Sequence, residues 1–228
     1  MKSIFFDLYG TLVDIHTDET KPEVWIALNT FFKNHNKIIP NLKKQFFTAI
    51  RKVEDSLLDY DIVTILQDLS GLEENVCIKA AQLFREKSIN HLRLFDGVIS
   101  LLKTLKENGY NIYLLSNAQA VFTVLELKKL KIYDFFDEIF ISSLYKVKKP
   151  NFDFYNLAIK KTASSYNSSM MIGNDYKNDI EPAQTLGLKT IFIYTEGQTP
   201  KIDIAPDLPN GFDAKRILNL ISERLGYL

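Results

Sequence analysis

The chain has 228 residues, and 46% of them are hydrophobic, enough to bury a sizeable core in one large domain or in one domain with an insertion. Lys plus Arg and Asp plus Glu number 28 each, so no overall charge favours nucleic acid, an anionic membrane or a polycationic partner. No run of about 18 apolar residues predicts a membrane span. Cys77, the single cysteine, excludes an internal disulfide and fits a reducing compartment. We therefore expect a cytoplasmic protein that acts on a small substrate.

The first predicted element is a buried strand over Ser3 to Phe6, which is apolar after its first residue. The sequence that follows is Asp7, Leu8, Tyr9, Gly10 and Thr11. A carboxylate thus stands where an apolar strand gives way to a glycine turn. This is a position suited to a nucleophilic aspartate.

Residues from about 17 to 92 have helical periodicity, and no strand is predicted among them. Val24, Trp25, Leu28, Phe31 and Phe32 form one face of a first helix. Further helices are predicted over 42–58, 60–69 and 73–90. This segment therefore predicts a compact bundle of about four helices.

From Leu94 onward, short apolar strands alternate with amphipathic helices. Strands are predicted over 111–115, 138–141, 170–172 and 190–194, and helices over 98–107, 121–130, 152–162, 180–186 and 214–225, with a surface loop over 195–209. Such alternation predicts an α/β fold with a parallel sheet covered by helices on both faces, whose ligands bind beyond the carboxyl ends of the strands. The core would comprise residues 1–16 and 93–228, and the helical segment 17–92 would be an insertion over the carboxyl edge.

Polar residues follow these strands at the points where ligands would bind. They are Asp7, Thr11, Ser116, Asn117, Ser142, Ser143, Asn174, Asp175 and Asp179, with Lys149 nearby. A potential nucleophile, hydroxyl and amide donors, a cation and a carboxylate pair suit displacement by an enzyme carboxylate. The developing negative charge of that reaction has to be held by preorganised donors and cations.

Four of these groups, in this order, resemble the motifs of the haloacid dehalogenase superfamily of hydrolases. They are Asp7-Leu8-Tyr9-Gly10-Thr11, Ser116-Asn117, Lys149-Pro150 and Gly173-Asn174-Asp175-Tyr176-Lys177-Asn178-Asp179. The resemblance implies a Rossmann-like core with an inserted helical cap. It also implies that Asp7 is a covalent nucleophile, that Ser116 and Asn117 donate to the transferred group, and that Lys149 holds its charge.

The same residues have structural alternatives. Asp7 is a possible helix N-cap, Thr11 is equally suited to capping its turn, and Ser116 and Asn117 are natural N-caps for the helix that follows. A helix N-terminus is itself an anion site, so capping and substrate binding are compatible. Lys149 is distinguished from its neighbouring lysines only by its position directly before Pro150.

Tyr9 departs from the pattern of the superfamily's phosphatases, which usually carry there an aspartate that protonates the leaving group and later activates water. A tyrosine, with a pKa of about 10, is a poor base at neutral pH. In the superfamily's 2-haloacid dehalogenases this position is commonly tyrosine, since halide needs no general acid. Tyr155 also resembles a substrate-binding tyrosine of those dehalogenases, and core packing on a helix explains it equally well.

Two features oppose dehalogenation. Those dehalogenases use an arginine early in the cap, whereas the first arginine here is Arg51, and Lys33 or Lys37 would replace it imperfectly. The fourth motif is acidic, which suits Mg²⁺ and phosphoryl transfer. By resemblance we expect Asp7, Tyr9 and Asp175 at the metal, with Gly10 contributing to substrate binding.

The fourth motif leaves its own roles open. Aligned on Asn178-Asp179, it places Asn174 where a first aspartate commonly stands and Asp175 next to it. Asp175 is the favoured metal ligand and Asp179 its outer-shell partner. Asn174 is an alternative ligand through its amide oxygen, and Asp179 could instead cap the helix before Pro182.

Outside the motifs, His16 is a possible substitute acid or base, against an interpretation as polar surface. Arg85, His91 and Arg93 would either bind an anionic substrate or form a solvated helix end. Taken together, the sequence predicts a Mg²⁺-dependent phosphatase of a small anionic metabolite. The alternatives are a metal-independent 2-haloacid dehalogenase and a low-turnover, cap-gated binding protein.

Overall fold

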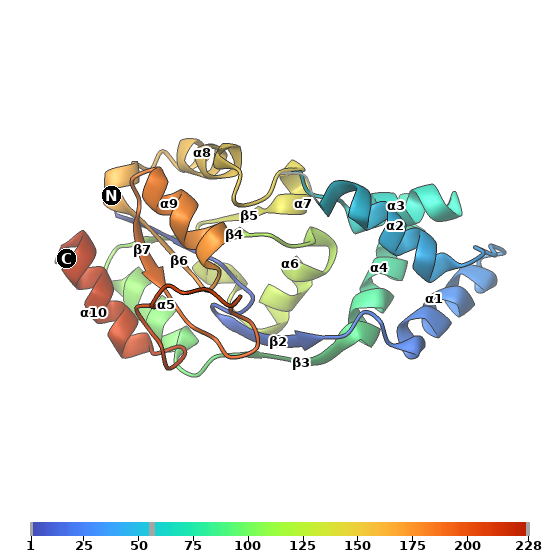
Figure 1. Cartoon of the computed structure of the whole chain (residues 1–228), viewed down its shortest axis with the longest axis horizontal. Coiled ribbons are helices and arrows are strands. Elements are labelled where there is room, and N and C mark those ends of the chain that lie inside the picture. Colours follow the sequence, from blue (N-terminus) through green and yellow to red (C-terminus); the bar gives the residue numbers. More distant parts are fainter. Residues whose placement is uncertain (1, 55–57, 227–228) are drawn as a thin grey trace.

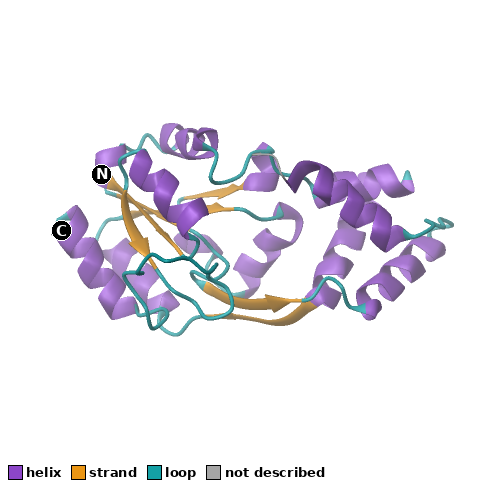
Figure 2. Cartoon of the chain, viewed as in Figure 1, coloured by secondary structure: helices purple, strands orange, loops and turns teal. Residues whose placement is uncertain are grey.

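The computed structural model describes residues 2–54 and 58–226, and its centre is a five-stranded parallel sheet (Figures 1 and 2). The strand order is β5-β4-β1-β6-β7. The strands are β1 (Ser3–Phe6), β4 (Asn111–Ser116), β5 (Glu138–Ile141), β6 (Ser169–Gly173) and β7 (Lys189–Phe192). The predicted parallel sheet is confirmed, with strand ends shifted by at most two residues.

Side chains alternate between the two faces of the sheet, as the two-residue period of a strand requires. Ile4 and Phe6 of β1 pack on one face with α5 (Val98–Glu107), α6 (Ala120–Lys129) and α10 (Ala214–Leu225). Phe5 packs on the other face with α8 (Phe152–Lys161) and α9 (Glu181–Thr185). Both faces are therefore covered, which explains why the strands are continuously apolar (Figure 1).

Short helical pieces complete this lobe. They are α7 (Ser142–Tyr145), single 3₁₀ turns at Tyr133–Phe135 and Tyr166–Ser168, and a π-helical turn at Tyr176–Ile180. The π turn begins within the fourth motif and ends immediately before α9. The helix predicted over 180–186 is therefore the end of a longer helical segment.

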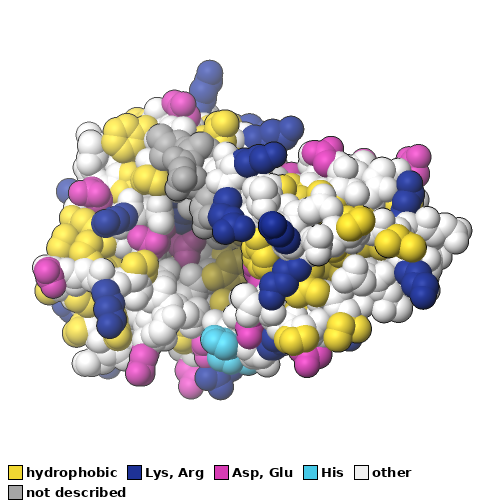
Figure 3. Space-filling model, turned by 45° about the vertical axis from the view of Figure 1, so that its right-hand side comes forward, with side chains coloured by type: hydrophobic (Ala, Val, Ile, Leu, Met, Phe, Trp, Pro, Cys, Tyr) yellow, Lys and Arg dark blue, Asp and Glu magenta, His cyan; other side chains and the backbone are white. Residues whose placement is uncertain are grey.

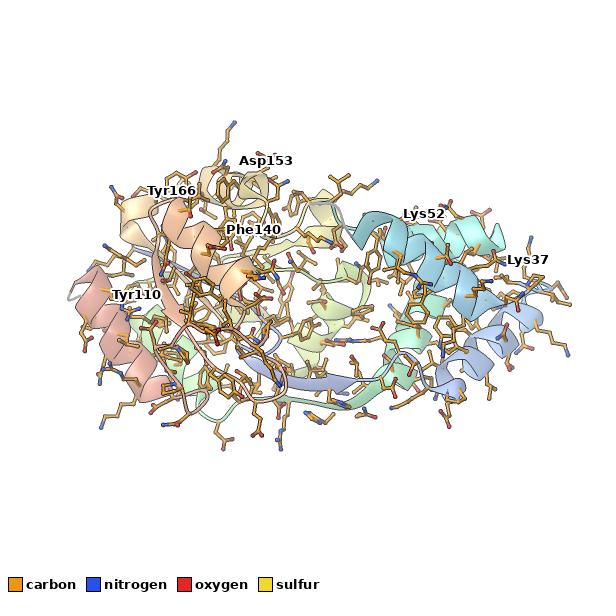
Figure 4. The ribbon with its side chains drawn as sticks, in the orientation of Figure 1. Lys37, Lys52, Tyr110, Phe140, Asp153 and Tyr166 are labelled. Atoms are coloured by element: carbon orange, nitrogen blue, oxygen red, sulfur yellow. The ribbon has the colours of Figure 1, made fainter. Side chains whose placement is uncertain are left out.

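The inserted segment forms four helices, as predicted: α1 (Pro22–Asn34), α2 (Leu42–Glu54), α3 (Ile62–Ser70) and α4 (Glu74–Ser88). They surround a core of their own, in which the Trp25 ring lies 5.4 Å from Phe46 and 5.8 Å from Phe84. The helix predicted over 42–58 ends, as far as the structure describes it, at Glu54, and residues 55–57 lie outside the described residues. Figure 4 shows Lys37 and Lys52 on this lobe and Phe140 inside the other.

The expectation of no strand between residues 17 and 92 is wrong at both ends. β2 (Val13–Thr17) and β3 (Ile89–Leu94) pair antiparallel and form a ribbon between the lobes, and α4 ends at Ser88 rather than continuing to Asn90 (Figure 2). The ribbon forms because the two ends of the insertion meet. A pattern read along one segment does not contain that long-range pairing.

The two lobes also meet beyond the carboxyl ends of β4 and β5, beside α3. The Gln119 side chain before α6 accepts a hydrogen bond from Ile62 N at 2.9 Å and donates one to Tyr60 O at 2.9 Å. Ser142 Oγ donates to the Asp59 carboxylate. The inserted helices are thus held to the core by side-chain contacts as well as by the ribbon.

Candidate functional site

Asp7 lies directly after β1, where the structure brings together three of the predicted motifs. Its carboxylate accepts hydrogen bonds from Lys149 Nζ at 2.8 Å, Thr11 Oγ1 at 3.1 Å and Ser116 Oγ at 3.3 Å. Asp7 is 8% exposed, so this carboxylate is nearly enclosed yet reachable. These contacts orient an aspartate oxygen without using all its acceptor capacity, as a nucleophile requires.

Lys149 lies between two carboxylates. Its ammonium donates to Asp7 Oδ1 at 2.8 Å and to Asp179 Oδ1 at 2.6 Å, and its side chain is 2% exposed. Burial alone would lower the pKa of Lys149, but the two carboxylates raise it, so the cation persists. Burial raises the pKa of Asp179 to about 7 although Lys149 opposes that shift. The buried Lys149 ammonium therefore forms ion pairs with both Asp7 and Asp179.

Asn117 holds the main chain of Lys149. Its Nδ2 donates to Lys149 O at 2.9 Å, and its Oδ1 accepts from Lys149 N at 2.8 Å. The expectation that Ser116 or Asn117 caps the next helix is wrong, because α6 starts at Ala120 with Gln119 at its N-cap position. Asn117 thus positions the Lys149 cation, while the neighbouring Ser116 contacts Asp7.

The polar side chains of the fourth motif have two roles: some stabilise the turn, and others contact the residues around Asp7. Asp175 accepts hydrogen bonds from Lys177 N, Asn178 N and Asn178 Nδ2 at 3.0, 3.1 and 2.7 Å, so its carboxylate caps the π turn. Asp179 accepts from Asp175 N at 3.0 Å in addition to Lys149. The expected metal ligand therefore has its carboxylate engaged by the turn that follows it.

Asn174 contacts Thr11, which in turn contacts Asp7. Its Oδ1 accepts from Thr11 Oγ1 at 3.2 Å, and its Nδ2 donates to Gln198 O at 3.1 Å. Thr11 Oγ1 therefore lies within hydrogen-bond distance of both Asp7 Oδ2 and Asn174 Oδ1, and its one hydrogen is available to either oxygen. Gly10, with φ of +82°, leaves room for this amide, because a Cβ there would lie 2.3 Å from Asn174 Nδ2.

Tyr9 directs its hydroxyl to α6. The hydroxyl donates to Glu126 Oε2 at 2.6 Å and lies 3.0 Å from Thr123 Oγ1. Arg85 of α4 binds the same Glu126 and lies 5.2 Å from the centroid of the Tyr9 ring. Burial and the Glu126 charge raise the pKa of Tyr9 far above its usual range, so it stays protonated.

These groups surround a small cavity of about 150 Å³. Its lining is Asp7, Tyr9, Ser116, Asn117, Lys149, Asn174, Asp175, Asn178, Asp179 and Gln198. All of these residues lie outside the four inserted helices. In the space-filling view of Figure 3, the middle of the molecule is hollowed, and acidic side chains lie there beside apolar ones.

Gln198 is the lining residue that sequence reasoning did not find. It lies in the predicted surface loop after β7, and its Nε2 donates to Asp14 Oδ1 at 3.0 Å. In the same loop, Thr195 Oγ1 donates to Gly10 O at 2.6 Å. A single glutamine in a polar loop carries no signal of its own, so only the fold reveals its place.

Several candidates lie elsewhere. Tyr155 is 1% exposed in the core, and its hydroxyl donates to the Asn178 carbonyl. His16 stacks on His91 in the ribbon at 6.1 Å, and His91 and Arg93 both bind Asp14. Arg85 is paired with Glu126. None of these five side chains contributes to the lining of the cavity.

The donor set at Asp7 fits a hard cation. Within residues 2–54 and 58–226, no group of three or more His, Cys, Asp or Glu side chains is arranged to hold a metal. Asp7 and Asn174 nevertheless both line a cavity with space for water, and Thr11 Oγ1 lies 3.1 and 3.2 Å from an oxygen of each. Mg²⁺ commonly takes one or two protein oxygens and keeps several waters, so this pair suits it.

Known proteins resemble the chain along most of its length. It is 26% identical over 200 residues to a glyceraldehyde 3-phosphate phosphatase of Methanothermobacter thermautotrophicus, covering 86% of this chain and 87% of the relative. It is 22% identical over 230 residues to a phosphoglycolate phosphatase of Nitrosospira multiformis, covering 96% of each.

Solved structures share the fold. A HAD phosphatase from Thermococcus onnurineus matches with a TM-score of 0.66 at 18% identity, covering 97% of this chain and 98% of the other. A 2-haloacid dehalogenase from Pseudomonas syringae pv. Tomato DC3000 matches with a TM-score of 0.69 at 16% identity, covering 98% and 99%. At these identities the likeness establishes the architecture alone.

Two further observations concern membrane-spanning helices and the family of the chain. Over the described residues, no helix has both the length and the apolar character needed to cross a bilayer. The family profile described as haloacid dehalogenase-like hydrolase matches residues 1–187, which include all four motifs. On that match, the chain belongs to the haloacid dehalogenase-like hydrolases.

Proposed function

We propose that this hydrolase is a Mg²⁺-dependent phosphatase of a small phosphorylated metabolite, with Asp7 as its nucleophile. The observation that carries the proposal is the environment of Asp7: a buried ammonium at 2.8 Å and two hydroxyls at 3.1 and 3.3 Å, at the wall of a small polar cavity. Such donors hold the charge that accumulates when phosphorus is attacked. The names of the phosphatase relatives support the same reaction.

In the first step, an Asp7 oxygen attacks phosphorus and forms an aspartyl phosphate. Lys149 and Ser116 hold the phosphoryl oxygens, and Asn117 fixes Lys149 through its two main-chain hydrogen bonds. Water then attacks the same phosphorus and releases phosphate from Asp7. Asp179 keeps the Lys149 ammonium in place during both steps.

We assign the cation to Asp7 and Asn174 rather than to Asp175. The amide of Asn174 has its nitrogen on Gln198 O, and its oxygen faces Thr11, which also contacts Asp7. The Asp175 carboxylate is bound by the turn that follows it, since all three of its hydrogen bonds come from Lys177 and Asn178. When bound, Mg²⁺ would neutralise charge on the phosphoryl oxygens. The Tyr9 main chain remains a further proposed ligand.

Dehalogenation is a second candidate, which Tyr9 alone favours. Attack by Asp7 on a halogen-bearing carbon would need a cation free to bind the substrate carboxylate. Arg85 is buried and lies 5.2 Å from the centroid of the Tyr9 ring, but Glu126 holds it through two hydrogen bonds of 2.6 and 3.1 Å. The phosphatase assignment is therefore preferred. Its substrate would be a small cytoplasmic anion, in keeping with the single cysteine and the balanced charge.

The test measures phosphate release from a panel of small phosphorylated metabolites, with and without Mg²⁺, beside halide release from 2-chloropropionate. Wild type should release phosphate only with Mg²⁺, and Asp7→Asn should lower kcat/KM by at least about 10³-fold, as expected when a nucleophile is removed. Phosphate release that survives Asp7→Asn would overturn the proposal. Halide release without metal would establish dehalogenation, and thermal stabilisation by small anions without turnover would establish a binding protein.

A further inference from the structure

The side chains around the cavity that could protonate a leaving group determine which class of substrate can react. Cleavage of a phosphate ester leaves negative charge on the departing oxygen, and an alcohol, whose pKa is close to the value of about 16 for water, leaves slowly unless it is protonated. A carboxylate, with a pKa of about 4, or a phenolate, with a pKa of about 10, departs more readily as an anion. The groups able to donate a proton therefore decide which esters can react.

Tyr9 does not supply this proton. Its hydroxyl has one hydrogen, and this hydrogen is donated to Glu126 Oε2 at 2.6 Å. Glu126 is held in turn by Arg85, whose guanidinium contacts both carboxylate oxygens. Releasing the hydroxyl toward the cavity would leave a buried carboxylate with one partner fewer. The residue two places after the nucleophile is thus engaged in the contact between α4 and α6.

The other side chains that line the cavity are amides, which release no proton, the Ser116 hydroxyl, which donates to Asp7, and three charged groups. Asp175 caps the π turn, and Asp179, whose pKa burial raises to about 7, shares the Lys149 ammonium with Asp7 and therefore lies on the attacking side. The Lys149 ammonium contacts the Asp7 carboxylate itself. In an in-line displacement the leaving oxygen lies on the opposite side of phosphorus from Asp7, away from that ammonium.

We infer that this enzyme, if it is the phosphatase proposed above, acts on phosphate compounds whose leaving group departs without a proton, acyl phosphates foremost and aryl or enol phosphates next. Asp7 attacks phosphorus, and the bond from phosphorus to the leaving oxygen breaks with its electron pair on that oxygen, releasing a carboxylate. Water then attacks the aspartyl phosphate, and both of its protons leave with the product as H₂PO₄⁻. Asp7 is recovered as a carboxylate, and no general acid takes part.

The test compares two substrates of similar size and different leaving group, acetyl phosphate and ethyl phosphate, at fixed pH and Mg²⁺. Wild-type kcat/KM should be at least about 10²-fold higher for acetyl phosphate, the contribution that general acid catalysis would otherwise make to ethyl phosphate. A ratio below about tenfold would overturn the inference. Absence of phosphate release from every substrate would instead overturn the phosphatase proposal, and this inference with it.

Variants of Tyr9 show whether the acetyl-to-ethyl ratio reflects the missing general acid or only the greater intrinsic reactivity of acetyl phosphate. Tyr9→Asp restores a carboxylic acid beside the nucleophile, and Tyr9→Asn is the matched control that removes the same contacts without adding an acid. The acetyl-to-ethyl ratio should be at least about tenfold smaller in Tyr9→Asp than in Tyr9→Asn. Equal ratios in these two variants would overturn the inference.

Tyr9→Phe provides an independent test should the polar variants fail to fold, because it keeps the buried ring. The acetyl-to-ethyl ratio should match that of wild type, since the lost hydroxyl donates to Glu126 and not to substrate. A selective loss of activity on ethyl phosphate would identify Tyr9 as a proton donor and overturn the inference.

Discussion

Arg85 of α4 and Glu126 of α6 form a bidentate ion pair that joins the inserted helices to the core. The two N–O distances are 2.6 and 3.1 Å, and the side chains are 10% and 8% exposed. The same carboxylate accepts a hydrogen bond from the hydroxyl of Tyr9, which lies two residues after Asp7 in the chain. Contact between the lobes and the geometry next to Asp7 are therefore coupled through one glutamate.

Breaking this pair should destabilise the protein. Arg85→Met keeps an apolar side chain between the Phe122 and Tyr9 rings but leaves Glu126 buried without its cation, at a cost of about 3 kcal/mol in the free energy of unfolding. The double variant Arg85→Met, Glu126→Gln should recover much of that loss, because a neutral amide needs no counter-ion. Urea denaturation measures both. Equal stability of the single and double variants would contradict a charge-based role.

Gly10 should not tolerate a side chain, because alanine there would bring both backbone strain and a steric clash. Gly197 serves as the control, because alanine there would bring the strain alone. Gly10 and Gly197 have φ angles of +82° and +73°, so alanine at either position costs about 1 kcal/mol of backbone strain. Only at Gly10 would the new Cβ also meet Asn174, at 2.3 Å, whereas nothing lies within 4 Å at Gly197. Gly10→Ala should therefore lose more stability and most phosphatase activity. Indistinguishable effects in thermal unfolding and turnover would refute the close packing on Asn174.

The assignment of Asn174 to the cation predicts a difference between adjacent residues. Asn174→Ala removes the amide oxygen and should raise the Mg²⁺ concentration for half-maximal activity by at least about tenfold. Asp175→Asn should change it little, since asparagine also caps a helical turn. Titrations of activity against Mg²⁺ measure both values. The reverse order of effects would transfer the ligand role to Asp175.

Asp179 should give the metal-free protein a characteristic dependence of stability on pH. Burial raises its pKa from 3.8 to about 7, although Lys149 opposes the shift, so between these values the folded state binds more protons than the unfolded state. The stabilisation from this group is fully present below about pH 4 and is lost as pH rises through about 7. Asp179→Asn should flatten that decline in urea denaturation with EDTA present. Parallel curves for wild type and variant would show that another group titrates.

The sheet and the place of Asp7 at the end of β1 were predictable because their signals are local. Strands buried on both faces are continuously apolar, and Asp7 follows one of them directly, so neighbouring residues contain the evidence. Lys149 was identifiable only through its motif, since its sequence neighbours are also lysines. The structure adds that its side chain is buried between two carboxylates, which no charge count reveals.

Other features depend on partners distant in sequence. The ribbon needs β2 and β3 to meet, Tyr9 needs Glu126, and Gln198 reaches the cavity only because its loop folds back on Gly10. The role of Asp175 was hard to predict for a different reason, because capping a turn and binding a cation both favour aspartate. Residue type alone does not choose between these roles, and the structure adds that all three hydrogen bonds to the Asp175 carboxylate come from the turn that follows it.

The central position of β1 has a consequence for biosynthesis. β1 pairs with β4 from Asn111 and with β6 from Ser169, so neither neighbour exists when the ribosome releases the first strand. The four inserted helices are synthesised next and can pack with one another, because their contacts are local. The apolar segment that ends at Asp7 is therefore translated before either strand that pairs with it. Asp7 reaches its final surroundings only after Ser116 and Lys149, which contact it, have been translated.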